Sequence, residues 1–204
     1  QFEKHHYPEG YPQAISKKNS LDHFLSLDSL TKLIRRETYR MDIELVGANK
    51  DCEIITEGKS PYYIQYYNHK ALHVHAYQKI TYKNIYPNID WVVYLNANGQ
   101  TNSLSSGEGR GEVKYDFIVH PGGNSADIKL KSKWAENIKI NADGSIVFKT
   151  NMGSITDNAP ISFQENISIQ TQFKLNDCLI SFQISDYDKS KTLTIDPNIV
   201  WSTY

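Results

Sequence analysis

The sequence has 204 residues, with 22 basic and 23 acidic side chains and a formal net charge of −1. This length suits one domain that folds without help from metals or disulfides. The charges are spread evenly, which argues against a nucleic-acid partner. No apolar run approaches the ~18 residues that a bilayer span needs, and the first ten residues contain no hydrophobic signal segment. We therefore expect no nucleic-acid binding and no membrane span.

Residues 1–36 are predicted to form an irregular and helical lead-in. Pro8, Gly10 and Pro12 interrupt the first part. The stretch "SLDHFLSLDSLTKLIRRE" then spaces its apolar residues by three and four, which is typical of helix, and Ser20 is a suitable N-cap. A short N-terminal helical segment is expected.

From residue 37 to residue 204 the pattern alternates with a period of two, which predicts a β-rich domain. The predicted strands include "TYRMDIELVG", "CEIIT", "YYIQYY", "HVHAYQKITYK", "IDWVVYL", "VKYDFIV" and "ADIKLKSK". A polar, glycine- and serine-rich segment near 96–112 is predicted to be a long flexible loop.

The second half of the chain contains the clearest hairpin signal. Asp143 and Gly144 lie between two alternating runs, and Asp-Gly supplies the positive φ angles of a tight turn. Short strands follow at intervals of roughly 8–12 residues, the spacing of sandwiches and barrels. The fold class is therefore predicted as all-β, an antiparallel β-sandwich-like domain with a short N-terminal helical segment.

The aromatic stretch "YKNIYPNIDWVVY" is predicted to be two strands joined by a turn. Pro87 has the fixed φ of a first turn corner, and Asn88 tolerates the left-handed position after it. Ile89 and Trp91 would then face the core, while Asp90 points the other way and bonds to the backbone of the turn.

Two cysteines, Cys52 and Cys178, lie in strand-like runs. Both suit small core positions, and a disulfide between them is the alternative if the chain is exported. Their spacing does not resemble a zinc motif, and no cofactor is expected.

Three aspartates lie among apolar strand residues: Asp90, Asp116 and Asp196. Burying a carboxylate is costly unless it is hydrogen-bonded. They therefore either pin strand ends and turns or form a hydrolytic pair. Pro197 after Asp196 favours the structural interpretation, and we expect a non-catalytic protein.

Three histidines, His69, His73 and His75, fall within seven residues. Side chains alternate along a strand, so His73 and His75 share one face and form a candidate site for zinc or copper, with His69 as a third ligand. An ordinary exposed strand face is the favoured alternative.

Aromatic side chains form a second candidate site, this time for glycans. Its residues are Tyr62, Tyr63, Tyr66, Tyr67 and Trp91. Exposed rings of this kind stack on sugars. Cross-strand aromatic pairing within the sheet is the favoured alternative.

Several segments, in the same order, resemble an uncharacterised N-terminal β-rich domain of bacterial proteins. They are "YRMDIELVGAN", "HAYQKITYKNIYPNIDWVVY", "YDFIVHPGG", "INADGSIVFKT", "PISFQ" and "YDKSKTLTIDPNIVWSTY". In that family the domain precedes SBBP-type β-propeller repeats in secreted or surface proteins of Bacteroidetes, many of them associated with gliding motility or type IX secretion.

The resemblance implies a secreted, cell-surface location and a structural or adhesive role. The expected partners are other domains of the same polypeptide or other surface proteins, with glycans as the alternative. Asn88 stands where the family has glycine, and the resemblance implies no catalytic residues.

Overall fold

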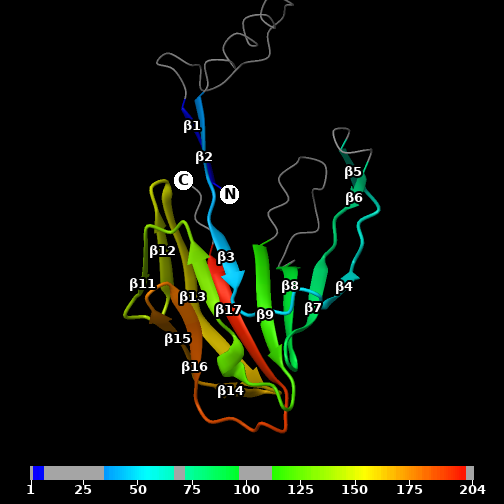
Figure 1. Ribbon diagram of the computed structural model, residues 1–204, viewed down its shortest axis with the longest axis vertical. Coiled ribbons are helices and arrows are strands. Elements are labelled where there is room, and N and C mark those ends of the chain that lie inside the picture. Colours follow the sequence, from blue (N-terminus) through cyan, green and yellow to red (C-terminus); the bar gives the residue numbers. More distant parts are fainter. Residues whose placement is uncertain (1, 7–34, 67–71, 97–111, 201–204) are drawn as a thin grey trace, which may run out of the picture.

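The computed structural model describes residues 2–6, 35–66, 72–96 and 112–200. Within these ranges the strands pair antiparallel, and the helical structure is a single 3-10 turn, η1 (Ser125–Asp127). Two sheets of unequal width form the body of the molecule (Figure 1). The prediction of an all-β, antiparallel, sandwich-like fold is therefore confirmed.

The narrow sheet has four strands in the order β15-β16-β10-β3. Their bounds are β3 (Asp42–Leu45), β10 (Leu130–Lys133), β15 (Thr171–Asn176) and β16 (Leu179–Ile184). Buried and exposed residues alternate in β10, where Leu130 and Ser132 are buried and Lys131 and Lys133 are exposed. This alternation gives the narrow sheet one face that covers the core and one that faces solvent.

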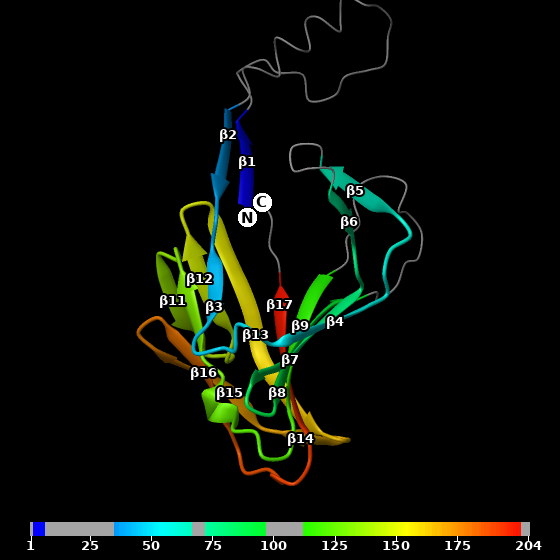
Figure 2. The ribbon, with the colours of Figure 1, turned by 45° about the vertical axis from the view of Figure 1, so that its right-hand side comes forward.

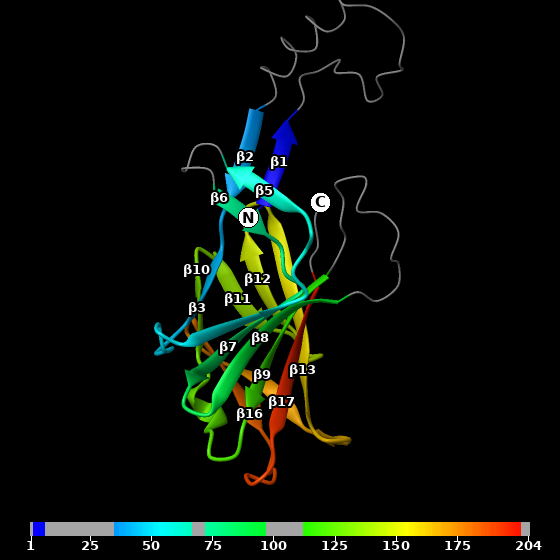
Figure 3. The same cartoon turned by 90° about the vertical axis from the view of Figure 1, so that its right-hand side faces the viewer.

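The wide sheet has nine strands, with the path β11-β12-β13-β17-β9-β8-β7-β4 and with β14 beside β13. Their bounds are β4 (Glu53–Glu57), β7 (Lys79–Tyr86), β8 (Ile89–Asn96), β9 (Glu112–Val119), β11 (Asn137–Ile140), β12 (Ile146–Thr150), β13 (Gly153–Gln164), β14 (Ile167–Ile169) and β17 (Leu193–Val200). Figure 3 shows β7, β8, β9, β17 and β13 side by side in this order.

Two smaller ribbons extend beyond the two large sheets (Figures 1 and 2). One pairs β1 (Phe2–His6) with β2 (Arg35–Tyr39), and the other is the hairpin of β5 (Tyr63–Tyr66) and β6 (Leu72–His75). The strand at residues 2–6 was not anticipated. Most of the predicted N-terminal helical segment lies outside the described residues, as does the predicted loop between β8 and β9.

The hydrophobic core lies between the two sheets. Phe117 of β9 is fully buried and makes an edge contact with Phe182 of β16, with ring centroids 6.0 Å apart. Phe182 in turn contacts Phe173 of β15 at 5.6 Å. Ile155 of β13 and other apolar residues of β9, β12 and β17 complete this cluster. We call the side of the wide sheet that faces this core its inner face, and the opposite side its outer face.

The turn between β7 and β8 consists of Pro87 and Asn88, and Asn88 has a φ of 55°. The Asn88 carbonyl oxygen accepts a hydrogen bond of 2.9 Å from the backbone N–H of His120, which ties the turn to the end of β9. Gly123 packs so closely here that a Cβ would lie 2.7 Å from the Asn88 oxygen. Only glycine fits such an approach of one backbone to another.

The hairpin between β11 and β12 contains Asp143 and Gly144, but its turn is longer than a two-residue turn. The backbone N–H of Asn141 donates to the Ser145 carbonyl, and Gly144 alone adopts a positive φ, of 84°. The Asp143 carboxylate instead accepts hydrogen bonds from the Ser145 N–H and hydroxyl, at 2.9 and 2.6 Å. These bonds fix the turn from the side chain.

Both cysteines are free thiols in the structure, with Cys178 exposed and Cys52 half-buried against the core. Cys178 is therefore not the core residue that its strand-like context indicated, because it lies in the turn before β16. A thiol assay on the unreduced protein should detect Cys178 in the folded state and both cysteines in denaturant. Detection of no free thiol in denaturant would show that the two cysteines are bonded.

Candidate functional site

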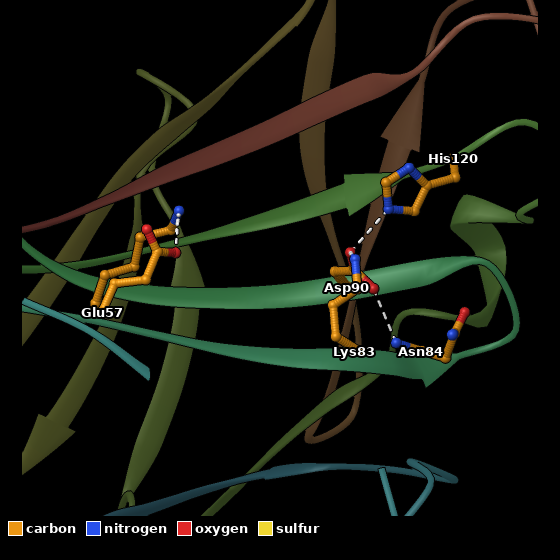
Figure 4. Close-up of polar contacts among 6 residues, drawn as sticks. Glu57, Lys83, Asn84, Asp90 and His120 are labelled. Carbon is orange, nitrogen blue, oxygen red and sulfur yellow. Dashed lines mark hydrogen bonds and ion pairs between the residues drawn. The ribbon is translucent and has the colours of Figure 1, made fainter. Parts of the chain in front are cut away.

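Asp90 is the most heavily bonded of the aspartates that the sequence singled out. It lies on β8 with its side chain on the outer face, and the residue is only 3% exposed. Its carboxylate accepts hydrogen bonds from the Lys83 ammonium, from the backbone N–H of Asn84 at 2.8 Å and from Nε2 of His120 at 2.8 Å (Figure 4). One carboxylate thus joins β7, β8 and the end of β9.

The local sequence explains why β7 needs this carboxylate. The pairing of β7 with β8 shifts register between Tyr82 and Tyr86, and Asn84 there has a φ of 50°. Such a bulge turns a backbone N–H away from the ladder, and Asp90 supplies its acceptor. Burial opposes ionisation of Asp90, but hydrogen bonds from the Lys83 ammonium, the His120 ring and the backbone outweigh it and hold its pKa below the ordinary value.

Asp116 of β9 and Asp196 of β17 form a second carboxyl group pair on the outer face. The two side chains share a hydrogen bond, and the Tyr94 hydroxyl donates to Asp116 at 3.3 Å. Burial and the nearby Asp196 raise the pKa of Asp116 to about 6, and burial also raises the pKa of Asp196. The pair therefore holds one proton in mildly acidic solution.

A third carboxyl group, Asp157 of β13, lies close to this pair but on the inner face. It is 4% exposed and accepts a 3.0 Å hydrogen bond from the hydroxyl of Tyr115, a core residue of β9. Burial, with a smaller contribution from Asp196, raises the pKa of Asp157 to about 7. Its Oδ1 atom is buried and has no partner among the described residues, which favours the protonated acid further.

Sequence reasoning missed Asp157, Tyr94 and Tyr115, and it did not connect Asp116 with Asp196. The two residues are about 80 positions apart in the chain and meet because β17 pairs with β9, with Ile195 opposite Phe117. Asp157 follows the buried Ile155 at a spacing of two, which places it on the inner face. That spacing was the available signal, but Pro160 made this part of β13 look like two short strands.

A carboxylic acid beside a carboxylate is the arrangement with which aspartic proteases share one proton. Hydrolytic chemistry also needs a cleft that holds a substrate. Three open hollows of about 460 to 510 Å³ lie on the described part of the chain, and neither Asp116 nor Asp196 lines them. The positions of the three carboxyl groups, at the junction of β9, β13 and β17, suit a role in holding these strands together.

The histidines of β6 pack on an aromatic ring. The Tyr63 ring centroid lies 4.4 Å from that of His73 and 5.8 Å from that of His75, so both histidines lie on one face of the hairpin. Nδ1 of His75 lies 3.1 Å from the Ser60 carbonyl oxygen. His69, the third proposed ligand, is outside the described residues, within which no group of three ligating side chains is placed to hold a metal ion.

The proposed aromatic platform is divided between two places. Trp91 stacks on Tyr82 on the inner face of the wide sheet, with ring centroids 5.0 Å apart. Tyr62 and Tyr63 lie in and beside β5 and are 72% and 50% exposed. Tyr67 and the side chain of Tyr66 lie outside the described part of the structure.

The remaining predicted structural residues belong to β17. Pro197 is fully buried, directly after Asp196, and the β17 register with β13 shifts at this position between Asn158 and Ile161. A proline is tolerated at such an irregularity because its missing N–H removes no regular ladder bond there.

A comparison with protein families finds one matching model, described as a domain of unknown function (DUF7948), over residues 3–198. No curated protein and no solved structure matches the chain. Among the residues that the structure describes, no helix has the length and apolar character to span a bilayer.

Proposed function

We propose that this chain, which belongs to the DUF7948 family, is a non-catalytic structural or adhesive module of a secreted, cell-surface bacterial protein. In this proposal it contacts other domains of the same polypeptide or other surface proteins. The ordered segments that resemble the domain preceding SBBP-type repeats in Bacteroidetes support the location and the setting. The β5–β6 hairpin supports the contact itself.

The observation that carries the proposal is the apolar surface of this hairpin. Tyr62, Tyr63, Ile64 and Val74 are 72%, 50%, 62% and 45% exposed, within a short stretch of chain. The hairpin extends away from the two large sheets (Figures 1 and 2). Apolar residues gathered on one projecting element are characteristic of contact surfaces, whereas single exposed apolar residues are common everywhere.

The engagement of the carboxyl groups gives the second line of support. Asp90 binds three donors from two strands and a loop, and Asp157 is bonded inside the core. A catalytic carboxyl group must instead reach a substrate. A hydrolytic role for Asp116 and Asp196 remains the alternative, since these two groups share a proton on the outer face.

The test is an affinity measurement between the chain and the polypeptide that flanks it in the full-length protein. Replacing Tyr63 and Ile64 with serine should weaken this association at least about tenfold, because both side chains lose their apolar contact area. The matched control replaces Ile161 and Ile167, which are similarly exposed on β13 and β14. Equal affinities for the hairpin variant and the unaltered chain would refute the proposed contact.

A further inference from the structure

We propose that the free edge of β4 binds an extended strand of another protein, with basic residues on one side of that strand and apolar residues on the other. This inference deepens the proposed function and rests on the module's contact with other polypeptides. It concerns a different element from the β5–β6 hairpin, so the two can fail separately.

The strand β4 ends the wide sheet, and all five of its residues are exposed. It pairs with β7 on one side only. The Glu57 carbonyl accepts a 3.1 Å hydrogen bond from the Gln78 N–H, so the backbone groups of Glu57 point toward β7. Successive residues of a strand point in opposite directions, so Ile54 and Thr56 direct their N–H and C=O groups toward the free edge.

Side chains in neighbouring strands form rows that end at β4. On the outer face, Glu53 lies opposite Lys83, whose ammonium is bonded to Asp90. At the other end of β4, Glu57 forms a 2.8 Å ion pair with Lys79 (Figure 4). The rows thus alternate acid and base from strand to strand and end in an acid. A next strand with a base in each row would continue the pattern, because opposite charges across strands stabilise a pair.

The acid at the end of one row has no counterpart in the described residues. Glu53 forms no ion pair there, since Lys83 is held by the buried Asp90. Between the two acids lies Ile55, 39% exposed, which would contact an apolar residue of the added strand. The outer side of the partner strand should therefore read base, apolar, base at alternate positions.

The inner side of the partner strand should be apolar. Ile54 shares a row with Tyr82 and Trp91, and it is 57% exposed although those two rings stack on each other. A strand beside β4 would cover Ile54 and extend this apolar row. Recognition of this kind combines backbone hydrogen bonds with contacts to alternate side chains.

A second copy of the same chain is not the partner that this edge fits. Antiparallel pairing of two β4 strands about Ile55 would place Glu53 of each copy opposite Glu57 of the other. Like charges directly opposite each other destabilise a strand pair, and charged edge residues are a common protection against self-association. The edge is therefore selective for a basic partner.

The experiment uses the chain as it is and two synthetic peptides. One is acetyl-Thr-Lys-Val-Val-Val-Lys-Thr-amide, and the other has glutamate in place of both lysines. Nuclear magnetic resonance and amide hydrogen exchange report on β4. We expect the lysine peptide to slow exchange of the Ile54 and Thr56 amides and to bind at least about tenfold tighter than the glutamate peptide at low salt, with the difference shrinking as salt is added.

Two sets of variants separate charge from backbone pairing. Changing Glu53 and Glu57 together to glutamine should reduce the preference for the lysine peptide to less than about twofold. Thr56→Pro removes an N–H directed at the free edge, so it should abolish peptide binding while the fold is retained, and Thr56→Val should bind as the unaltered chain does.

Three results would overturn the inference. They are no change at β4 at millimolar peptide, equal binding of the two peptides, or a β4-mediated dimer of the chain itself. If these occur while the hairpin variant still weakens the association with flanking polypeptide, the inference fails and the proposed function stands.

Discussion

The free energy of unfolding is expected to fall by about 2–4 kcal/mol between pH 5 and pH 8. Burial raises the pKa of Asp157 to about 7 and the pKa of Asp116 to about 6 in the folded protein. An aspartate in the unfolded chain titrates near pH 4. The folded state therefore binds more protons than the unfolded state between these values, and the stability that protonation contributes is lost as the pH rises through 6 and 7.

Denaturant unfolding at several pH values measures this effect, and Asp157→Asn isolates its largest part. The amide cannot ionise and can still accept the Tyr115 hydroxyl, so the variant should lose much of the pH dependence and be more stable than the unaltered chain at pH 8. Asp143→Asn is the control, because Asp143 is exposed and its pKa is lowered. Stability that is constant or rises from pH 5 to pH 8 would contradict the assignment of a buried acid at Asp157.

Replacing Asp90 with alanine is expected to cost about 2–4 kcal/mol of stability. The change leaves the Asn84 N–H without its acceptor at the β7 bulge and removes the link from β7 to His120. Asp90→Asn should cost less, because an amide oxygen can still accept from the backbone. Lys83→Met should cost about 1 kcal/mol or less, because the Lys83 side chain is one-third exposed and water can replace part of its interaction.

The order of these losses distinguishes a structural carboxylate from a catalytic one. Thermal or denaturant unfolding of the three variants gives the order directly, with circular dichroism to establish that each is folded. Residues kept for catalysis are often stabilising to remove. An Asp90→Ala variant as stable as the unaltered chain would show that Asp90 does not hold the strands together.

Much of the fold is predictable from the sequence because period-two alternation reports local burial. It reports neither which sheet a strand joins nor where a run is interrupted. The alternation from Tyr39 to Leu45 continues through Arg40 and Met41, yet β2 and β3 end and begin there and pair with different strands. The run that begins at His73 likewise divides into β6 and β7, which belong to different sheets.

The acidic residues show the same limit at the level of side chains. Asp90 lies six residues from the N–H that it binds, so its bonding to nearby backbone could be anticipated. The proximity of Asp116, Asp157 and Asp196 depends on the order of β9, β17 and β13 in the sheet, which is a long-range property. The burial that raises the pKa of Asp157 is equally invisible without the narrow sheet that covers the core.

Hydrogen exchange of the full-length protein, compared with that of this chain alone, tests most directly whether the domain is a contact module. The account predicts that amides of β5 and β6 exchange at least about tenfold more slowly in the full-length protein, while those of β9 and β17 are unchanged. Identical exchange of the hairpin in the two proteins, or in the full-length protein mixed with its surface partners, would contradict it.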